Sequence, residues 1–100
     1  MPLPPPDFHE FIERVRVLGE LYGLSITSWG RTDQHNKNVR GHENSWHRWG
    51  RGGCACDLQT DLTGDAAKEQ LEQAAGTARK LGMDAVVYAV HVHVEPADPL

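Results

Sequence analysis

The chain has few of the residues that mark several large protein classes. It contains only two cysteines, Cys54 and Cys56, so a small secreted framework held together by several disulfides is excluded. The two lie so close along the chain that a disulfide between them is hard to form. We therefore expect a protein of a reducing compartment.

Long apolar runs and basic clusters are missing as well. No stretch of about 18 apolar residues is present, which excludes a membrane-spanning helix. The N-terminal residues, MPLPPPDFHE, have neither the basic nor the apolar region of a secretory signal. The net charge is −4 without any basic run, so nucleic acids and anionic membranes are poor candidates as partners. We expect synthesis in the cytoplasm, unless the chain is a domain of a longer protein.

A chain of 100 residues predicts a single domain spanning 1–100, and we expect a monomer. The proline-rich residues 1–6 and the last residues, 97–100, are predicted to be extended tails. A core of this size gives only marginal stability, which a bound metal ion would increase.

Two main helices are predicted from capping residues and apolar spacing. Asp7 is placed to cap the first helix, with Glu10 three positions later completing a capping box, and Gly23 ends it. The second helix covers residues 65–81 and ends at Gly82. The apolar stripes are Phe8, Phe11, Ile12, Val15, Leu18 and Tyr22 in the first helix, and Ala67, Leu71, Ala74, Ala75, Ala78 and Leu81 in the second. A short helix is also predicted over residues 32–39.

Three segments are predicted to be strands, at residues 24–29, 54–58 and 85–96. The last is the clearest, because it is β-branched and alternating and is closed by Pro96. Helices and strands alternate without a regular βαβ pattern. The sequence therefore predicts an α+β fold with a small antiparallel sheet and two main helices.

Alternation along a strand separates its apolar residues from its polar ones. In the last strand, one face carries Val90, Val92 and Val94, and the other carries His91, His93 and Glu95. In the preceding strand, Cys54 and Cys56 share one face, and Ala55 and Asp57 share the other. Because cysteine behaves as a small buried hydrophobe, we expect the cysteines in the core and Asp57 on the outward face.

These polar faces, beside a loop that carries His47, suggest a metal site. Zinc binds imidazole nitrogen and carboxylate oxygen, and a catalytic zinc keeps three protein ligands and one open position. Three residues could supply these ligands: His47, Asp57 and either His91 or His93. The open position would lower the pKa of a bound water and polarise a carbonyl.

Two other interpretations stay open from spacing alone. In the first, a closed structural zinc site is formed by Cys54, Cys56, His91 and His93. The CxC and HxH pairs do not have the usual spacing of a zinc finger. Alternatively, the histidines are ordinary surface groups.

The segment SWGRTDQHNKNVRGHENSWHRWGRGGCACDL resembles the core of the zinc D-alanyl-D-alanine carboxypeptidase family. That family includes phage L-alanyl-D-glutamate peptidases, and hedgehog signalling domains share its fold. Four motifs carry the resemblance in the family's order: Gly30-Arg31-Thr32, then His35, Asn36 and Val39 with Asn44 and Ser45, then Ser45, His47, Gly50, Ala55 and Asp57, and finally VHVE at 92–95. The match covers roughly residues 24–96, and it implies a fold similar to the hedgehog and D-Ala-D-Ala peptidase domains.

The resemblance implies roles for particular residues. His47, Asp57 and His93 would hold one Zn²⁺ ion, with His93 preferred over His91 because V-H-V-E is similar to the context of the family's last ligand. Arg31 would bind a carboxylate of the substrate, a role suited to the guanidinium group, and Ser45 would support the site. Three tryptophans are candidates for the cleft wall, although Trp29 is equally suited to packing; these are Trp29, Trp46 and Trp49. His35 and His42 are expected to be polar loop residues.

The chain departs from the family's pattern at two places. The family separates the corresponding histidine and aspartate by seven positions, and this chain separates His47 and Asp57 by ten. The glycines of residues 50–53 would let the loop bulge and keep both ligands, and Asp61 is the substitute if they do not. Relatives often carry a catalytic acid three or six residues before the last ligand, where this chain has Val90 and Val87.

The general base is therefore open, with three candidates. His91 and Glu95 lie on the face expected to hold the metal, and Glu43 is in the loop. The resemblance implies a zinc metallopeptidase that cleaves peptidoglycan stem peptides, as a D-Ala-D-Ala carboxypeptidase or an L-Ala-D-Glu endopeptidase. We expect it to act at the cell wall, as in a phage lysis (endolysin) or tail domain. The alternative is a non-catalytic zinc-binding module on the same fold.

Overall fold

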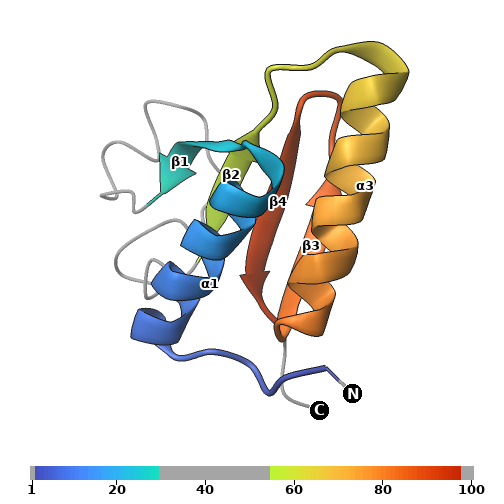
Figure 1. The fold of residues 1–100 in the computed structure, drawn as a ribbon. Coiled ribbons are helices and arrows are strands. Elements are labelled where there is room, and N and C mark those ends of the chain that lie inside the picture. The colour runs from blue at the N-terminus through green and yellow to red at the C-terminus, as the bar shows by residue number, and fades with distance from the viewer. Residues whose placement is uncertain (1, 30–54, 98–100) are drawn as a thin grey trace, which may run out of the picture.

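The computed structural model describes residues 2–29 and 55–97, which form two helices and a single sheet (Figure 1). The elements in chain order are α1 (Phe8–Tyr22), β1 (Ser25–Trp29), β2 (Cys56–Gln59), α3 (Gly64–Lys80), β3 (Met83–Val87) and β4 (His91–Pro96). All strand pairs are antiparallel, in the order β1-β2-β4-β3. The predicted α+β fold, with a small antiparallel sheet and two main helices, is confirmed.

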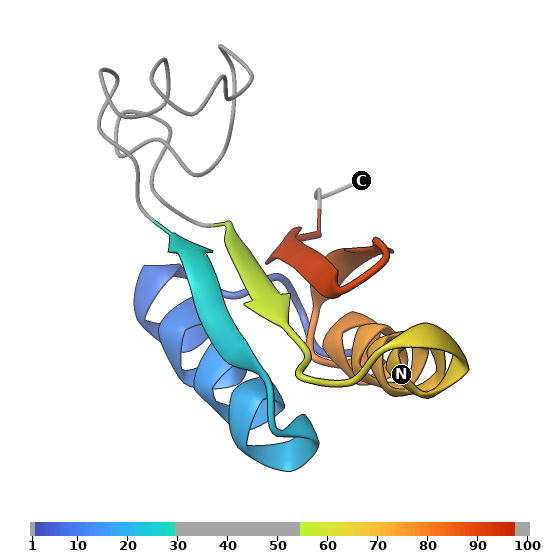
Figure 2. The ribbon, with the colours of Figure 1, turned by 90° about the horizontal axis from the view of Figure 1, so that it is seen from above.

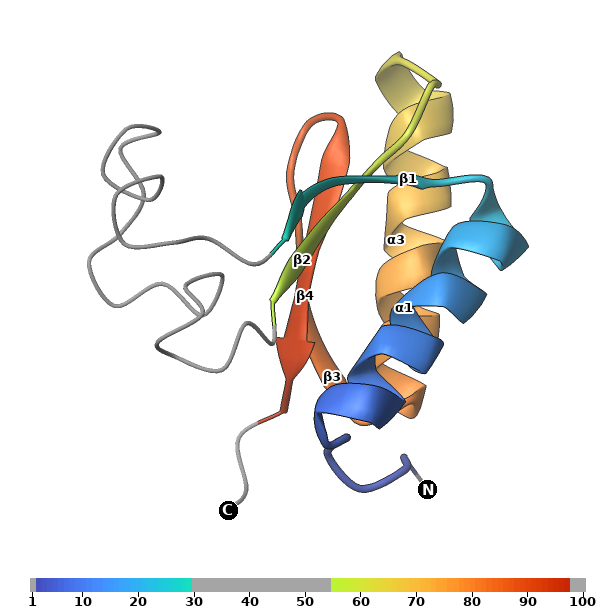
Figure 3. The same ribbon diagram turned by 90° about the vertical axis from the view of Figure 1, so that its left-hand side faces the viewer.

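Both helices cover the same face of the sheet, so the fold has two layers (Figure 3). Viewed from above, α1 lies beneath β1 and β2, and α3 lies beside β3 and β4 (Figure 2). The core fills the space between the layers. Within the described ranges, no helix is long and apolar enough to cross a membrane.

The first helix begins and ends as predicted. The Oδ1 atom of Asp7 accepts a hydrogen bond of 2.8 Å from the backbone N–H of Glu10, and this bond holds the pKa of the Asp7 carboxyl below its usual value. Phe11, Val15 and Leu18, three of the predicted apolar positions, are buried. Gly23 ends the helix in the left-handed conformation, with φ of 64°.

The second helix presents a buried face made mostly of alanine. Its buried residues are Ala67, Leu71, Ala74, Ala75 and Ala78, all from the predicted stripe, and Leu81 packs against the core just after the helix. Small side chains let the helix approach the sheet closely. The observed bounds, Gly64–Lys80, lie one residue before the predicted range at each end.

The prediction of one long strand over residues 85–96 is wrong, because the segment forms a hairpin. β3 and β4 pair with each other, and the chain reverses at Tyr88, whose backbone N–H donates to the carbonyl of His91 at 2.8 Å. A straight strand of that length would span roughly 40 Å, whereas the helix beneath it spans roughly 25 Å. The hairpin instead places two short strands over α3, and Val90 lies in the turn, 42% exposed, rather than in the core.

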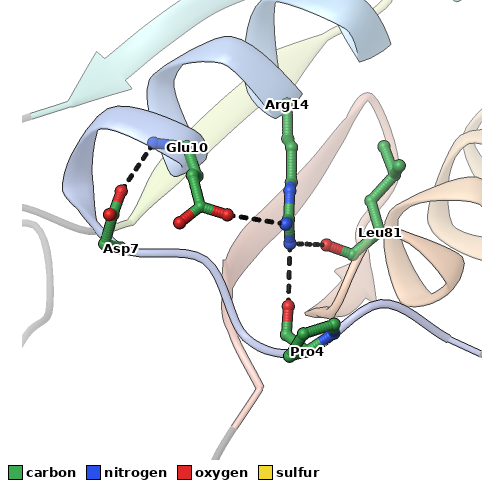
Figure 4. Close-up of polar contacts among 5 residues, drawn as sticks. All are labelled: Pro4, Asp7, Glu10, Arg14 and Leu81. Carbon is green, nitrogen blue, oxygen red and sulfur yellow. Dashed lines mark hydrogen bonds and ion pairs between the residues drawn. The ribbon is translucent and has the colours of Figure 1, made fainter.

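The proline-rich N-terminal residues are docked against the two helices (Figure 4). A guanidinium nitrogen of Arg14, Nη1, donates to the carbonyl of Pro4 at 2.9 Å and also to the carbonyl of Leu81. The backbone N–H of Leu3 donates to Lys80, and Pro6 is buried. These contacts join the segment before α1 to the C-terminal end of α3.

Gly82 lies beneath this docked segment, and we expect Gly82→Ala to destabilise the domain. Its φ of 78° is unfavourable for alanine by about 1–2 kcal/mol. A Cβ atom there would also overlap the carbonyl oxygen of Pro4, which belongs to the backbone, so the N-terminal segment would have to shift. Urea denaturation should therefore show a loss larger than the conformational cost alone.

Gly23→Ala is the matched control for this prediction. Gly23 has a similar φ of 64°, but a Cβ atom there meets no atom within 4 Å. The difference between the two variants isolates the contact with the N-terminal segment. Equal losses in both variants would contradict the prediction.

Candidate metal site

The register of the two central strands separates the face that the helices cover from the opposite face of the sheet. β2 and β4 pair so that Cys56 lies opposite Val94 and Leu58 opposite Val92, all four buried in the core. The residues that alternate with these four point to the other face, where Asp57 lies opposite His93 and Gln59 lies opposite His91. For these residues, the prediction that each strand turns its apolar side chains to one face and its polar side chains to the other is therefore confirmed.

Asp57 and His93 contact each other on the face opposite the helices. The Nδ1 atom of His93 and the Oδ1 atom of Asp57 are 2.9 Å apart, although the residues are separated by 36 positions in the chain. The side chains are 16% exposed for Asp57 and 22% for His93. Direct cross-strand partners bring their Cβ atoms to about 5 Å, so the strand pairing itself positions this pair.

Glu95 approaches the other ring nitrogen of His93. Its Oε1 atom lies 3.7 Å from Nε2, and its side chain is 28% exposed. This distance is within ion-pair range but longer than a hydrogen bond. The imidazole ring of His93 therefore has a carboxylate at each of its two nitrogens.

His91, the other histidine of the strand, has a different surrounding. It lies opposite Gln59, and its ring stacks on the ring of Tyr88 with centroids 4.7 Å apart. The register thus places His93, and not His91, beside Asp57. Across residues 2–29 and 55–97, no group of three or more His, Cys, Asp or Glu side chains is arranged to hold a metal ion.

The remaining predicted site residues lie outside the described residues. These are Arg31, His35, His42, Glu43, Ser45, Trp46, His47, Trp49 and Cys54, together with the predicted short helix at 32–39. The chain nevertheless leaves and re-enters the described structure at one place, because Trp29 pairs with Cys56 at the ends of β1 and β2. That junction is one residue from Asp57.

A β-bulge in β1 is a feature that strand alternation did not predict. Ile26 pairs with Leu58 and Ser28 with Asp57, so Thr27 is an extra residue between them. The bulge turns Trp29 toward the core, where its ring packs edge-on against Phe11 at 6.4 Å, and turns Ser28 toward the face of Asp57. The Thr27 hydroxyl donates to the Asp57 carbonyl at 3.5 Å. Trp29 is thus a packing residue.

Cys56 lies on the opposite face of the sheet from His93. It is fully buried, and burial, with a smaller effect of the Asp57 charge, raises the pKa of its thiol to about 12. A cysteine binds zinc as a thiolate, and it can share an ion with the histidines only from the same face of the sheet. The structure therefore argues against a closed site of cysteines and histidines. Asp61, the substitute for Asp57, is exposed in the connection between β2 and α3.

We expect Cys56 to be chemically inert in the folded protein. In a Cys54→Ser background, where Cys56 is the only thiol, Ellman's reagent at pH 8 should not react until denaturant is added, because the thiol is buried and protonated. Stoichiometric reaction should then follow in urea. Rapid reaction under native conditions would show that this side of the sheet is open.

Comparison of the chain with protein-family models, curated proteins and solved structures finds no match.

Proposed function

We propose that the protein is a zinc-dependent peptidase that acts on peptidoglycan stem peptides at the cell wall. The resemblance of four ordered motifs suggests this reaction. The observation that supports it most is the contact between Asp57 and His93, two residues that the resemblance assigns to one metal ion. This contact between two strands is an observation independent of the resemblance.

The geometry of the pair suits two ligands of one zinc ion. Zinc lies about 2.0–2.2 Å from nitrogen and oxygen ligands, so two donors in a tetrahedral shell are about 3.3 Å apart. The observed separation is 2.9 Å between Nδ1 and Oδ1. A small outward movement of either side chain would admit the ion, with His47 as the third ligand. Bound zinc would polarise the scissile carbonyl and lower the pKa of a water molecule.

Other residues of the chain would bind the substrate and accept its proton. Arg31 is suited to an acidic group of the stem peptide, because guanidinium pairs with carboxylate through two parallel hydrogen bonds. Ser45 would support the ligand loop. The candidates for the general base are His91 and Glu95, which lie on the same face as His93, and Glu43. A monomer would suffice for this site.

Digestion of purified peptidoglycan tests the proposal. We expect the zinc-loaded protein to release D-alanine or to separate L-alanine from D-glutamate, and mass spectrometry of the products distinguishes the two bonds. His93→Ala and Asp57→Asn should abolish cleavage, and chelation followed by zinc should remove and restore it. Asp84→Asn is the control, because Asp84 is an exposed carboxylate on the edge strand β3. Equal cleavage by wild type and His93→Ala would refute a zinc peptidase.

A non-catalytic zinc module is the second candidate. The two positions where relatives carry a catalytic acid hold Val87, which packs against the core, and Val90, which lies in the hairpin turn. Neither can move a proton. Binding of one equivalent of zinc without cleavage of any stem peptide would favour this candidate over the peptidase.

A further inference from the structure

The imidazole ring of His93 lies between two carboxylates that approach different nitrogens. Asp57 is 2.9 Å from Nδ1, and Glu95 is 3.7 Å from Nε2. All three side chains are at least two-thirds buried and extend from the two central strands of the sheet. Such an arrangement restricts both the orientation of the ring and the position of its proton.

A histidine that binds a metal through one nitrogen carries its proton on the other. The group that accepts this proton selects the tautomer and holds the ring in place, and a carboxylate does so most strongly. Nδ1 is the ring nitrogen that lies beside the Asp57 carboxylate. It is therefore the nitrogen that can share a metal ion with Asp57. The proton then lies on Nε2, which is the atom that faces Glu95.

We propose that Glu95 is a positioning residue that accepts a hydrogen bond from Nε2–H of His93 and so directs Nδ1 to the metal. This inference rests on the proposed zinc site. It assigns to Glu95 a role different from that of the general base, which leaves His91 as the base candidate among the described residues.

The present distance can close without moving the backbone. A charged hydrogen bond between imidazole and carboxylate is about 2.8 Å long, so the two atoms must approach by roughly 1 Å. The Glu95 side chain is 28% exposed and its backbone is held by pairing with Asp84 of β3. Rotation about the side-chain bonds of Glu95, with its backbone held in the sheet, is the movement that the proposal requires.

Zinc affinity at one fixed pH, measured by competition with a chromophoric chelator, tests the proposal. We expect Glu95→Ala to weaken binding on the order of 10- to 100-fold. Glu95→Gln should recover part of this loss, since its amide oxygen also accepts Nε2–H. Asp84→Asn, which changes the neighbouring carboxylate across from Glu95, should bind zinc like the wild type. Thermal unfolding of each metal-free variant verifies that it is folded.

A second measurement reads the tautomer directly. Long-range ¹H–¹⁵N spectra of the zinc-loaded wild type should show the His93 proton on Nε2, and in zinc-loaded Glu95→Ala this Nε2 proton, which has lost its acceptor, should exchange with water faster than in the wild type. An affinity for Glu95→Ala within twofold of the wild type, or a proton on Nδ1 in the loaded wild type, would overturn the role of Glu95 alone. Failure of the wild type to bind zinc would overturn the proposed function and this inference together.

Discussion

His93→Ala is expected to weaken zinc binding by about a thousandfold or more. A structural zinc site contributes roughly 10–16 kcal/mol of binding free energy, and loss of one of three protein ligands removes about 4 kcal/mol or more, which is a thousandfold in affinity. His93 contacts Asp57 directly, so His91 cannot replace it without a change of strand register. Isothermal titration of the metal-free protein with zinc measures the effect.

The thermal midpoint gives an independent measurement of the same prediction. A ligand that binds only the folded state stabilises it in proportion to the logarithm of its concentration. Excess zinc should therefore raise the midpoint of the wild type and leave that of His93→Ala nearly unchanged. His91→Ala is the matched control, because His91 lies on the same face but opposite Gln59. A larger loss of affinity in His91→Ala than in His93→Ala would mean that the wrong histidine has been assigned.

Phe11→Ala is expected to lower the free energy of unfolding by about 3–5 kcal/mol. Phe11 is fully buried, is the largest of the fully buried side chains among residues 2–29 and 55–97, and packs against Trp29. A domain of this length has only about 5–15 kcal/mol of stability in total, so this loss is a large fraction of it. The variant should therefore unfold at a clearly lower urea concentration than the wild type, as denaturation followed by far-ultraviolet circular dichroism would show.

Leu21→Ala is the control on the same helix. Leu21 is 64% exposed, so its replacement leaves no cavity in the core and should cost well under 1 kcal/mol. Equal losses of stability in the two variants would contradict the prediction. They would mean that the burial of Phe11 between α1 and the sheet does not stabilise the fold more than an exposed leucine does.

Local signals in the sequence predicted the helices because each signal acts over one or two turns. The hydrogen bond from Glu10 to Asp7, the left-handed Gly23 and the alanine face of α3 all follow from residues a few positions apart. The strand face of His93 was predictable for the same reason, since alternation needs only neighbouring residues.

Pairing between distant segments was not predictable in this way. The turn at Tyr88 contains no glycine, proline or asparagine, and strand-forming residues lie on both sides of it. The bulge at Thr27 likewise has no sequence signal, yet it decides that Trp29 faces the core. Alternation restricts His91 and His93 to one face, but only the register with β2 shows which of them meets Asp57. Whether that pair binds zinc stays a prediction.

The pairing of Trp29 with Cys56 has a consequence for how such a domain can change over evolution. The two ends of the intervening segment are anchored at adjacent positions of the sheet, so insertions and deletions between them leave every strand pair of β1 and β2 intact. The entropic cost of lengthening such a segment grows only with the logarithm of its length. The wider spacing of His47 and Asp57, relative to the family that the chain resembles, falls almost entirely in this interval. The segment can therefore change in length while the strand pairing that brings Asp57 and His93 together is kept.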